Sequence, residues 1–168
     1  KIKRWYDCFL KFNLKNAILV DGDDLTFDFN IAKRALKLFK SRRADLITPD
    51  SKMMPGYFTY AISINGINKL YKLATDSNLN TDVITEYLKL ACLKNAQVTS
   101  KKTEMNIANI RLTLDYDEDL EFYRQVYSKV SYLAPGPTVV ETILKEGLEN
   151  INWHRNQYFL QNQKIFNE

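Results

Sequence analysis

The sequence is poor in the side chains from which zinc and thiol sites are built. It has one histidine, His154, and two cysteines, Cys8 and Cys92, among 168 residues. A single histidine nearly excludes a zinc site or a catalytic pair built on imidazole. The two cysteines lie far apart without a metal-type spacing, which indicates reduced structural thiols and a cytoplasmic protein.

Long apolar runs and a large net charge are also missing. No run approaches the roughly 20 residues of a membrane span, and no signal peptide opens the chain. The 24 basic and 20 acidic residues leave a net charge of +4, spread along the chain, which is too small to indicate nucleic acid binding. We therefore expect a cytoplasmic protein that binds neither nucleic acid nor membrane.

Apolar periodicity predicts helices that alternate with strands. The chain starts at Lys1 inside an amphipathic pattern, which predicts a helix to about Phe12 and suggests a piece of a longer protein. Strands are predicted at 17–20, 44–48, 57–64, 97–102 and 110–114, and helices around 31–39, 67–74, 84–91, 116–130, 138–148 and 149–168. The start at Thr138 rests on a capping box with Glu141. This order predicts one α/β domain over residues 1–168 with a largely parallel sheet.

An acidic cluster ends the first predicted strand. The apolar run 17–20 stops at Asp21, Gly22, Asp23 and Asp24. Ligands of open α/β sheets bind beyond the carboxyl ends of such strands, and clustered carboxylates favour a shared cation. Hard oxygen ligands select Mg²⁺ or Mn²⁺. The alternative is that these are turn residues and an acidic entry to the following helix.

Asp115 stands in a similar place, between the predicted strand 110–114 and the predicted helix 116–130. Two strand ends can lie side by side in a parallel sheet, so Asp23 and Asp115 are predicted to meet around one ion. The alternative is that Asp115 only caps the helix that follows, as aspartate does well.

Three segments carry a resemblance to a known family. Residues 20–24, VDGDD, resemble the strand-end "GD" segment of the sugar cytidylyltransferases. Residues 110–121, IRLTLDYDEDLE, resemble the "RLTxDxxEDxE" segment of the spore-coat polysaccharide branch of that family, which also includes the CMP-Kdo and CMP-sialic acid synthetases. Residues 150–156, NINWHRN, are similar to that branch's C-terminal helix.

The resemblance implies a GT-A-like (Rossmann-like) nucleotidyltransferase fold that couples CTP to a sugar, often an acidic one, and releases pyrophosphate. Asp23 and Asp115 match the family's two metal-binding aspartates, with Mg²⁺ as the cofactor. The family's first strand and nucleotide loop would precede Lys1. We therefore expect these residues to be the C-terminal two-thirds of the domain and inactive by themselves. A homodimer is a further implication.

Candidate substrate contacts lie close to these segments in the sequence. Lys101 and Arg111 are placed to reach phosphates from strand ends, with an exposed surface role as the alternative. Lys52, in a loop rich in proline and glycine, is a candidate sugar contact. Asp21 stands where some branches of the family have glutamine, and it is the fourth predicted substrate contact.

Two other functions fit parts of the sequence. Asp21, Gly22 and Asp23 form a D-x-D motif after an apolar strand, which is typical of GT-A glycosyltransferases that use nucleotide-sugars. A non-catalytic interaction module with a nucleotidyltransferase fold is the third interpretation. A nucleoside triphosphate should stabilise a cytidylyltransferase, and a nucleoside diphosphate-sugar should stabilise a GT-A glycosyltransferase.

Overall fold

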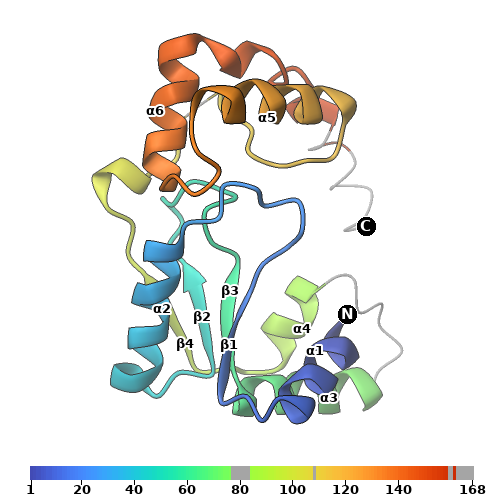
Figure 1. Ribbon diagram of the computed structural model, residues 1–168. Coiled ribbons are helices and arrows are strands. Elements are labelled where there is room, and N and C mark those ends of the chain that lie inside the picture. The colour runs from blue at the N-terminus through green and yellow to red at the C-terminus, as the bar shows by residue number, and fades with distance from the viewer. Residues whose placement is uncertain (77–83, 108, 159–160, 162–168) are drawn as a thin grey trace. The chain divides into compact units, whose positions relative to one another are not determined.

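The computed structural model describes residues 1–76, 84–107, 109–158 and 161 (Figure 1). Part of one prediction, the last helix at 149–168, lies outside the described residues. The chain divides into two compact units. The first unit comprises Lys1–Val20, Asn30–Ser51 and Phe58–Thr99, and the second comprises Asp21–Phe29, Lys52–Tyr57 and Ser100–Glu168. The single domain stays a prediction.

The first unit is built on a four-stranded sheet with the order β1-β3-β2-β4. Its strands are β1 (Asn16–Leu19), β2 (Leu46–Pro49), β3 (Tyr60–Ser63) and β4 (Asn95–Val98). The prediction of a mostly parallel sheet is wrong, because β3 pairs antiparallel with both β1 and β2, and only β2 and β4 run parallel. A loop without a crossover helix joins β2 to β3, and such a connection returns the chain antiparallel.

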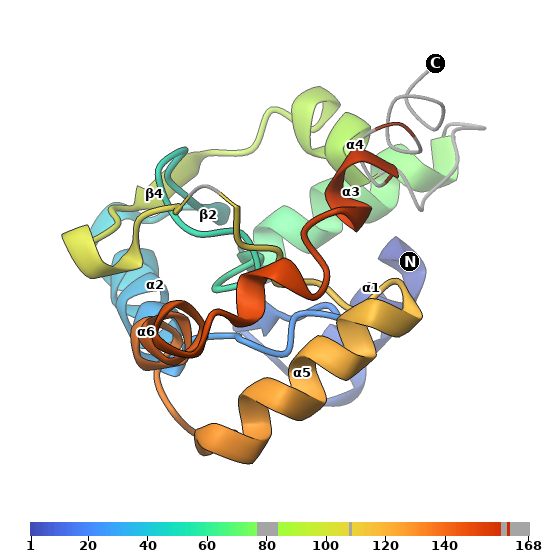
Figure 2. The same ribbon diagram turned by 90° about the horizontal axis from the view of Figure 1, so that it is seen from above.

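Four helices complete this unit, and each follows an apolar face recognised in the sequence. They are α1 (Ile2–Lys11), α2 (Phe29–Arg42), α3 (Ile64–Asp76) and α4 (Ile84–Leu90). Helix α2 lies on one side of the sheet, and α1, α3 and α4 lie on the other (Figure 1, Figure 2). Phe9, Ile62 and Leu70 are central members of the buried cluster between sheet and helices. A β-carbon at Gly66 would lie 2.6 Å from the carbonyl oxygen of Asp45, so the close approach of α3 to the chain before β2 requires glycine.

The second unit contains α5 (Asp117–Lys129) and α6 (Gly136–Glu146), which contact each other (Figure 1). Two short 3₁₀ helices, η1 (Lys102–Glu104) and η2 (Leu148–Asn150), also belong to it. Val126 of α5 and Ile143 of α6 are fully buried. In the part of the chain that the structure describes, no helix is long and apolar enough to cross a membrane.

One predicted strand, at 110–114, is not found, and another, at 97–102, lies at different residues from those predicted. Residues 110–114 have no regular secondary structure, although Ile110 and Leu112 are buried. Their apolar pattern therefore reflects packing rather than strand pairing. The strand predicted at 97–102 is found as β4, which ends at Val98, and the chain then enters η1.

The start of α6 also differs from the prediction. The helix begins at Gly136, two residues before the predicted cap at Thr138, with Pro137 in its first turn. The backbone N–H of Gly136 donates to the buried carboxylate of Asp28 at 3.0 Å. An acidic side chain more than a hundred positions earlier therefore caps the helix, and no local motif could have revealed it.

Candidate functional site

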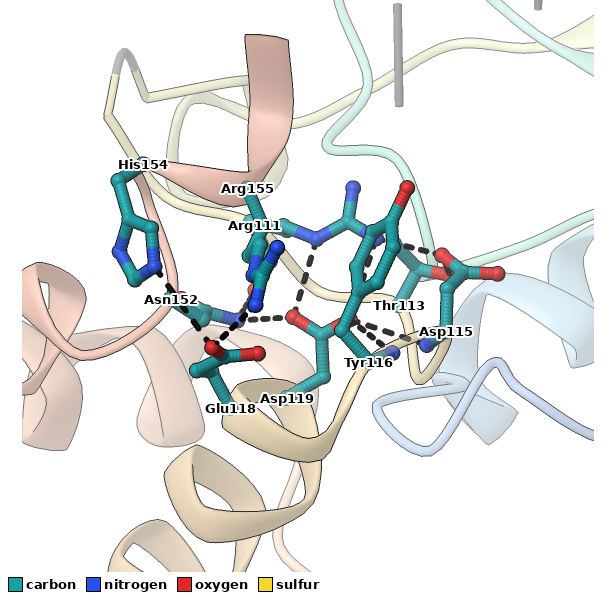
Figure 3. Close-up of polar contacts among 9 residues, drawn as sticks. All are labelled: Arg111, Thr113, Asp115, Tyr116, Glu118, Asp119, Asn152, His154 and Arg155. Atoms are coloured by element: carbon teal, nitrogen blue, oxygen red, sulfur yellow. Dashed lines mark hydrogen bonds and ion pairs between the residues drawn. The ribbon is translucent and has the colours of Figure 1, made fainter. Parts of the chain in front are cut away.

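The segment before α5 and the first turn of that helix form a buried polar network (Figure 3). Its centre is Asp119, whose side chain is fully buried. Asp119 Oδ2 accepts hydrogen bonds from the backbone N–H groups of Asp115, at 2.9 Å, and Tyr116, at 3.1 Å. Asp119 thus satisfies donors at the helix start that have no intrahelical partner, in the manner of a capping box.

Arg111 lies inside this network. Its side chain is 2% exposed, and its guanidinium holds Asp119 with two hydrogen bonds, Nε to Oδ1 at 3.0 Å and Nη2 to Oδ2 at 3.1 Å. The same Nη2 donates to Oδ2 of Asp115 at 2.5 Å. The alternative for Arg111, an exposed surface role, is therefore wrong. Its planar fork suits the simultaneous binding of two carboxylates.

Asn152 closes the network from the C-terminal segment. Its Nδ2 donates to Oδ1 of Asp119 at 2.8 Å and to the carbonyl oxygen of Arg111 at 3.2 Å, and the residue is fully buried. Two segments that resemble the family, 110–121 and 150–156, therefore meet at Asp119.

Asp115 lies at the outer edge of the network. Its Oδ2 accepts from Nη2 of Arg111 and from the hydroxyl of Thr113, the latter at 2.8 Å. Its Oδ1 points away from the other labelled residues (Figure 3), and the side chain is 32% exposed. An oriented carboxylate oxygen at the surface suits a hard cation such as Mg²⁺.

A second group of contacts ties the C-terminal segment to α5. Nη2 of Arg155 donates to Oε1 of Glu118 at 2.6 Å, and this hydrogen bond lowers the pKa of Glu118 below its ordinary value. The ring of Tyr116 lies near two guanidinium groups, that of Arg111 at 5.3 Å and that of Arg155 at 5.2 Å. His154 is exposed in a turn, and its Nε2 lies 3.9 Å from Oε1 of Glu118.

The acidic loop 21–28 forms two consecutive turns. The backbone N–H of Asp24 donates to the carbonyl of Asp21 at 3.1 Å, and that of Phe27 donates to the carbonyl of Asp24 at 3.3 Å. Asp21 and Asp24 are therefore turn residues, but the acidic entry expected for the following helix is not found, because α2 has no acidic residue in its first turn. Asp23 lies within the first turn and is partly exposed.

The loop is held against α5 at its centre. The hydroxyl of Tyr127 donates to the carbonyl of Leu25 at 2.6 Å. The neighbouring Tyr123 is buried, which raises the pKa of its hydroxyl, and the nearby Thr26 hydroxyl lowers it less than burial raises it. The contacts of Leu25 with Tyr127 and of Asp28 with Gly136 hold the part of the loop that follows the candidate metal ligand Asp23.

Lys52 and Lys101 are both exposed. Their segments pair through the bridge between Met53 and Met105, and the N–H of Asn106 donates to the carbonyl of Lys52 at 2.7 Å. Lys101 is the residue before η1 rather than a strand end. The structure therefore brings together Arg111 and Asp115 among the predicted residues, and it brings together the segments that carry Lys52 and Lys101.

Sequence reasoning missed three members of the site, Thr113, Asp119 and Asn152. A signal for Thr113 was present, because residues at spacings of two lie on one side of an extended backbone and Arg111, Thr113 and Asp115 have that spacing. Asp119 stands among three acidic residues in the first turn of α5, a pattern that the helix dipole alone explains. Nothing local marks Asn152, since its partners lie 33 and 41 positions away.

Within the described ranges, no group of three or more histidine, cysteine, aspartate or glutamate side chains is arranged to hold a metal ion. The meeting of Asp23 and Asp115 around one ion stays a prediction.

No family model matches the sequence, and no curated protein matches it. A solved structure does: a cytidylyltransferase from Leptospira borgpetersenii serovar Hardjo-bovis matches with a TM-score of 0.73 at 20% sequence identity. The fold is nucleotidyltransferase-like. The predicted fold class is thus confirmed, apart from the strand directions. The match covers 88% of this chain but 63% of the Leptospira protein, so this chain spans less than two thirds of that protein's length.

Proposed function

We propose that this chain is part of a Mg²⁺-dependent cytidylyltransferase that activates a sugar. In the proposed reaction, a sugar hydroxyl attacks the α-phosphorus of CTP, and pyrophosphate leaves. Asp23 and Asp115 would hold the metal ion. Asp21, Lys52 and Lys101 are proposed to contact the substrates.

One observation carries this proposal. Asp115 is partly exposed, with one oxygen held by Arg111 and Thr113 and the other pointing away from the rest of the network (Figure 3), on a fold like that of a cytidylyltransferase. A cap of α5 would accept a backbone N–H from the first turn of the helix, but among the described residues the Asp115 side chain accepts only from Arg111 and Thr113. The carboxylate of Asp115 therefore does not cap α5, and metal binding is the role proposed for it.

The chain's own residues supply orientation and positive charge. Mg²⁺, when bound, would neutralise charge on the α-phosphate and on the leaving pyrophosphate. Asp115 offers a carboxylate whose direction is set by its neighbours, and Asp23 offers one from a turn closed by the hydrogen bond between Asp24 and Asp21. Exposed amines such as those of Lys52 and Lys101 provide mobile positive charge for phosphate or an acidic sugar. Phosphoryl transfer demands little more of a protein than this positioning.

Thermal unfolding of the complete protein tests the proposal. We expect CTP with Mg²⁺ to raise Tm by several degrees, because a ligand at about 100 times its dissociation constant stabilises by about 2.7 kcal/mol. UTP, GTP and ATP should give smaller shifts. Asp23→Asn and Asp115→Asn should abolish the CTP shift, whereas the control Asp117→Asn, exposed in the first turn of α5, should retain it.

The outcomes separate the competing functions. Release of pyrophosphate from CTP with an acidic sugar would then identify the reaction. A shift with a nucleoside diphosphate-sugar but with no triphosphate would favour a GT-A glycosyltransferase. A protein that responds to neither ligand class, in wild type or variants, would overturn the enzyme proposal and favour an interaction module.

A further inference from the structure

We propose that Thr113 and Arg111 are positioning residues that set the direction of the Asp115 carboxylate. This inference rests on the proposed function, in which Asp115 is a metal ligand. It assigns Arg111 a different task from the phosphate contact that the sequence suggested, and it gives Thr113 a task for the first time.

The side-chain hydrogen bonds to Asp115 all go to one of its two carboxylate oxygens. Nη2 of Arg111 and Oγ1 of Thr113 both donate to Oδ2, the latter at 2.8 Å. Among the described residues, Oδ1 accepts no hydrogen bond, and it points away from the other labelled residues (Figure 3). Two donors on one oxygen restrict rotation of the carboxylate about its side-chain torsions. The other oxygen is therefore held in a constant direction.

Arg111, one of the two donors, is itself held by further hydrogen bonds. Arg111 has two hydrogen bonds to the fully buried Asp119, and Asn152 holds both Asp119 and the backbone of Arg111. A guanidinium fixed on one side by two bonds presents its Nη2 to Asp115 at a set position. Asp119 and Asn152 thus act on the Asp115 carboxylate through Arg111, and Asp119 also accepts the backbone N–H of Asp115.

Stability alone does not account for the contact between Arg111 and Asp115. The charge of Arg111 is already balanced by Asp119, a buried bidentate partner. Asp115 is one-third exposed, and ion pairs with a solvated partner contribute little to folding. The contact between Arg111 and Asp115 instead fixes the direction of the Asp115 carboxylate. Partners that orient metal ligands in this way typically change metal affinity by about 10-fold to 100-fold when they are removed.

The decisive comparison is between Thr113→Val and Thr113→Ser in the complete protein. Valine has nearly the shape of threonine without the hydroxyl, whereas serine keeps the hydroxyl that donates to Asp115. We expect Thr113→Val to weaken binding of Mn²⁺, used as a spectroscopic substitute for Mg²⁺ in the presence of CTP, on the order of 10-fold. Thr113→Ser should restore affinity toward that of the wild type. Electron paramagnetic resonance of free Mn²⁺ measures this without turnover.

A second pair of variants tests Arg111. Lysine is a point charge without the planar fork, so Arg111→Lys cannot hold Asp119 bidentately and reach Asp115 as well. We expect a loss of Mn²⁺ affinity and of kcat, with KM for CTP changed less. The control is Arg124→Lys on the exposed side of α5, which should match the wild type. If Arg111→Lys fails to fold, the Thr113 pair decides alone.

Equal Mn²⁺ affinity in Thr113→Val, Thr113→Ser and the wild type would overturn the positioning role while leaving the cytidylyltransferase proposal intact. A wild-type protein that binds neither Mn²⁺ nor CTP would overturn the proposed function, and this inference with it. The two failures are therefore distinguishable.

Discussion

Arg111 and Asp119 form a bidentate ion pair in the interior of the second unit, with donor–acceptor distances of 3.0 Å and 3.1 Å. Their side chains are 2% and 0% exposed. A buried pair of this kind contributes little over an apolar substitute, but the loss of one partner leaves an uncompensated charge. The pair also holds the start of α5 and the direction of Asp115, so stability and site geometry are coupled there.

Asp119→Ala should therefore be among the most destabilising single substitutions on α5. We expect a loss of about 3–5 kcal/mol in the free energy of unfolding, because Arg111 would remain buried without its main partner. Urea unfolding at neutral pH measures this. The control is Asp117→Ala in the same first turn, which is exposed and should cost less than about 1 kcal/mol. Equal losses in both variants would contradict this account of the pair.

Tyr127→Phe should loosen the acidic loop 21–28. The substitution removes the hydroxyl that donates to the carbonyl of Leu25 at 2.6 Å, at a cost of about 1 kcal/mol. We expect faster amide hydrogen exchange in the loop around Asp23, with exchange in α6 unchanged. Tyr132→Phe is the matched control, since Tyr132 is 77% exposed. If the loop exchanges at the wild-type rate in Tyr127→Phe, the hydrogen bond does not hold it.

Gly136→Ala should destabilise the junction of α6 with Tyr57. A β-carbon at Gly136 would lie 2.6–2.9 Å from three ring atoms of that tyrosine, so the ring or the helix must move. Overpacking of this kind costs about 1–3 kcal/mol. Gly22→Ala is the control, because nothing lies within 4 Å of its β-carbon position, and urea unfolding should show it neutral or slightly stabilised. A neutral Gly136→Ala would mean that the ring moves aside freely.

Asp45 should give the first unit an acid-sensitive contribution to stability. Burial raises the pKa of its carboxyl, but the hydrogen bond from Nζ of Lys69, at 2.6 Å, and that from the backbone N–H of Lys94 outweigh burial and lower the pKa below its ordinary value of 3.8. A carboxylate with a depressed folded-state pKa stabilises fully above its unfolded-state pKa. That contribution is lost as pH falls through the folded-state pKa.

Urea unfolding from pH 6 to pH 2 tests this. We expect the stability difference between the wild type and Asp45→Asn to be constant above about pH 5 and to shrink as the pH falls below about 4. The variant Asp7→Asn, on an exposed pair with Lys3 in α1, is the control and should change little. A difference that grows on acidification would contradict the sign of the pKa shift.

The sequence by itself determined the local elements and the place of Asp115. Apolar periodicity identified α1 to α5 because an amphipathic face is a local property of consecutive residues. The resemblance of residues 110–121 to a cytidylyltransferase segment predicted the nucleotidyltransferase-like fold, and the solved Leptospira structure agrees with it. The exit from β1 into an acidic turn was also visible in the order of Gly22 and its neighbours.

Only the tertiary structure decided how these elements are oriented and how the site is supported. The direction of β3 relative to its neighbours depends on hydrogen bonds to strands far away in the sequence. An alternating apolar pattern does not show whether a strand pairs parallel or antiparallel. The cap of α6 comes from Asp28, and the support of Arg111 comes from Asn152. Each is a contact between residues dozens of positions apart, formed because a buried donor or charge must find a partner wherever folding brings one near. Local patterns report burial, whereas long-range hydrogen bonds decide which buried polar groups meet.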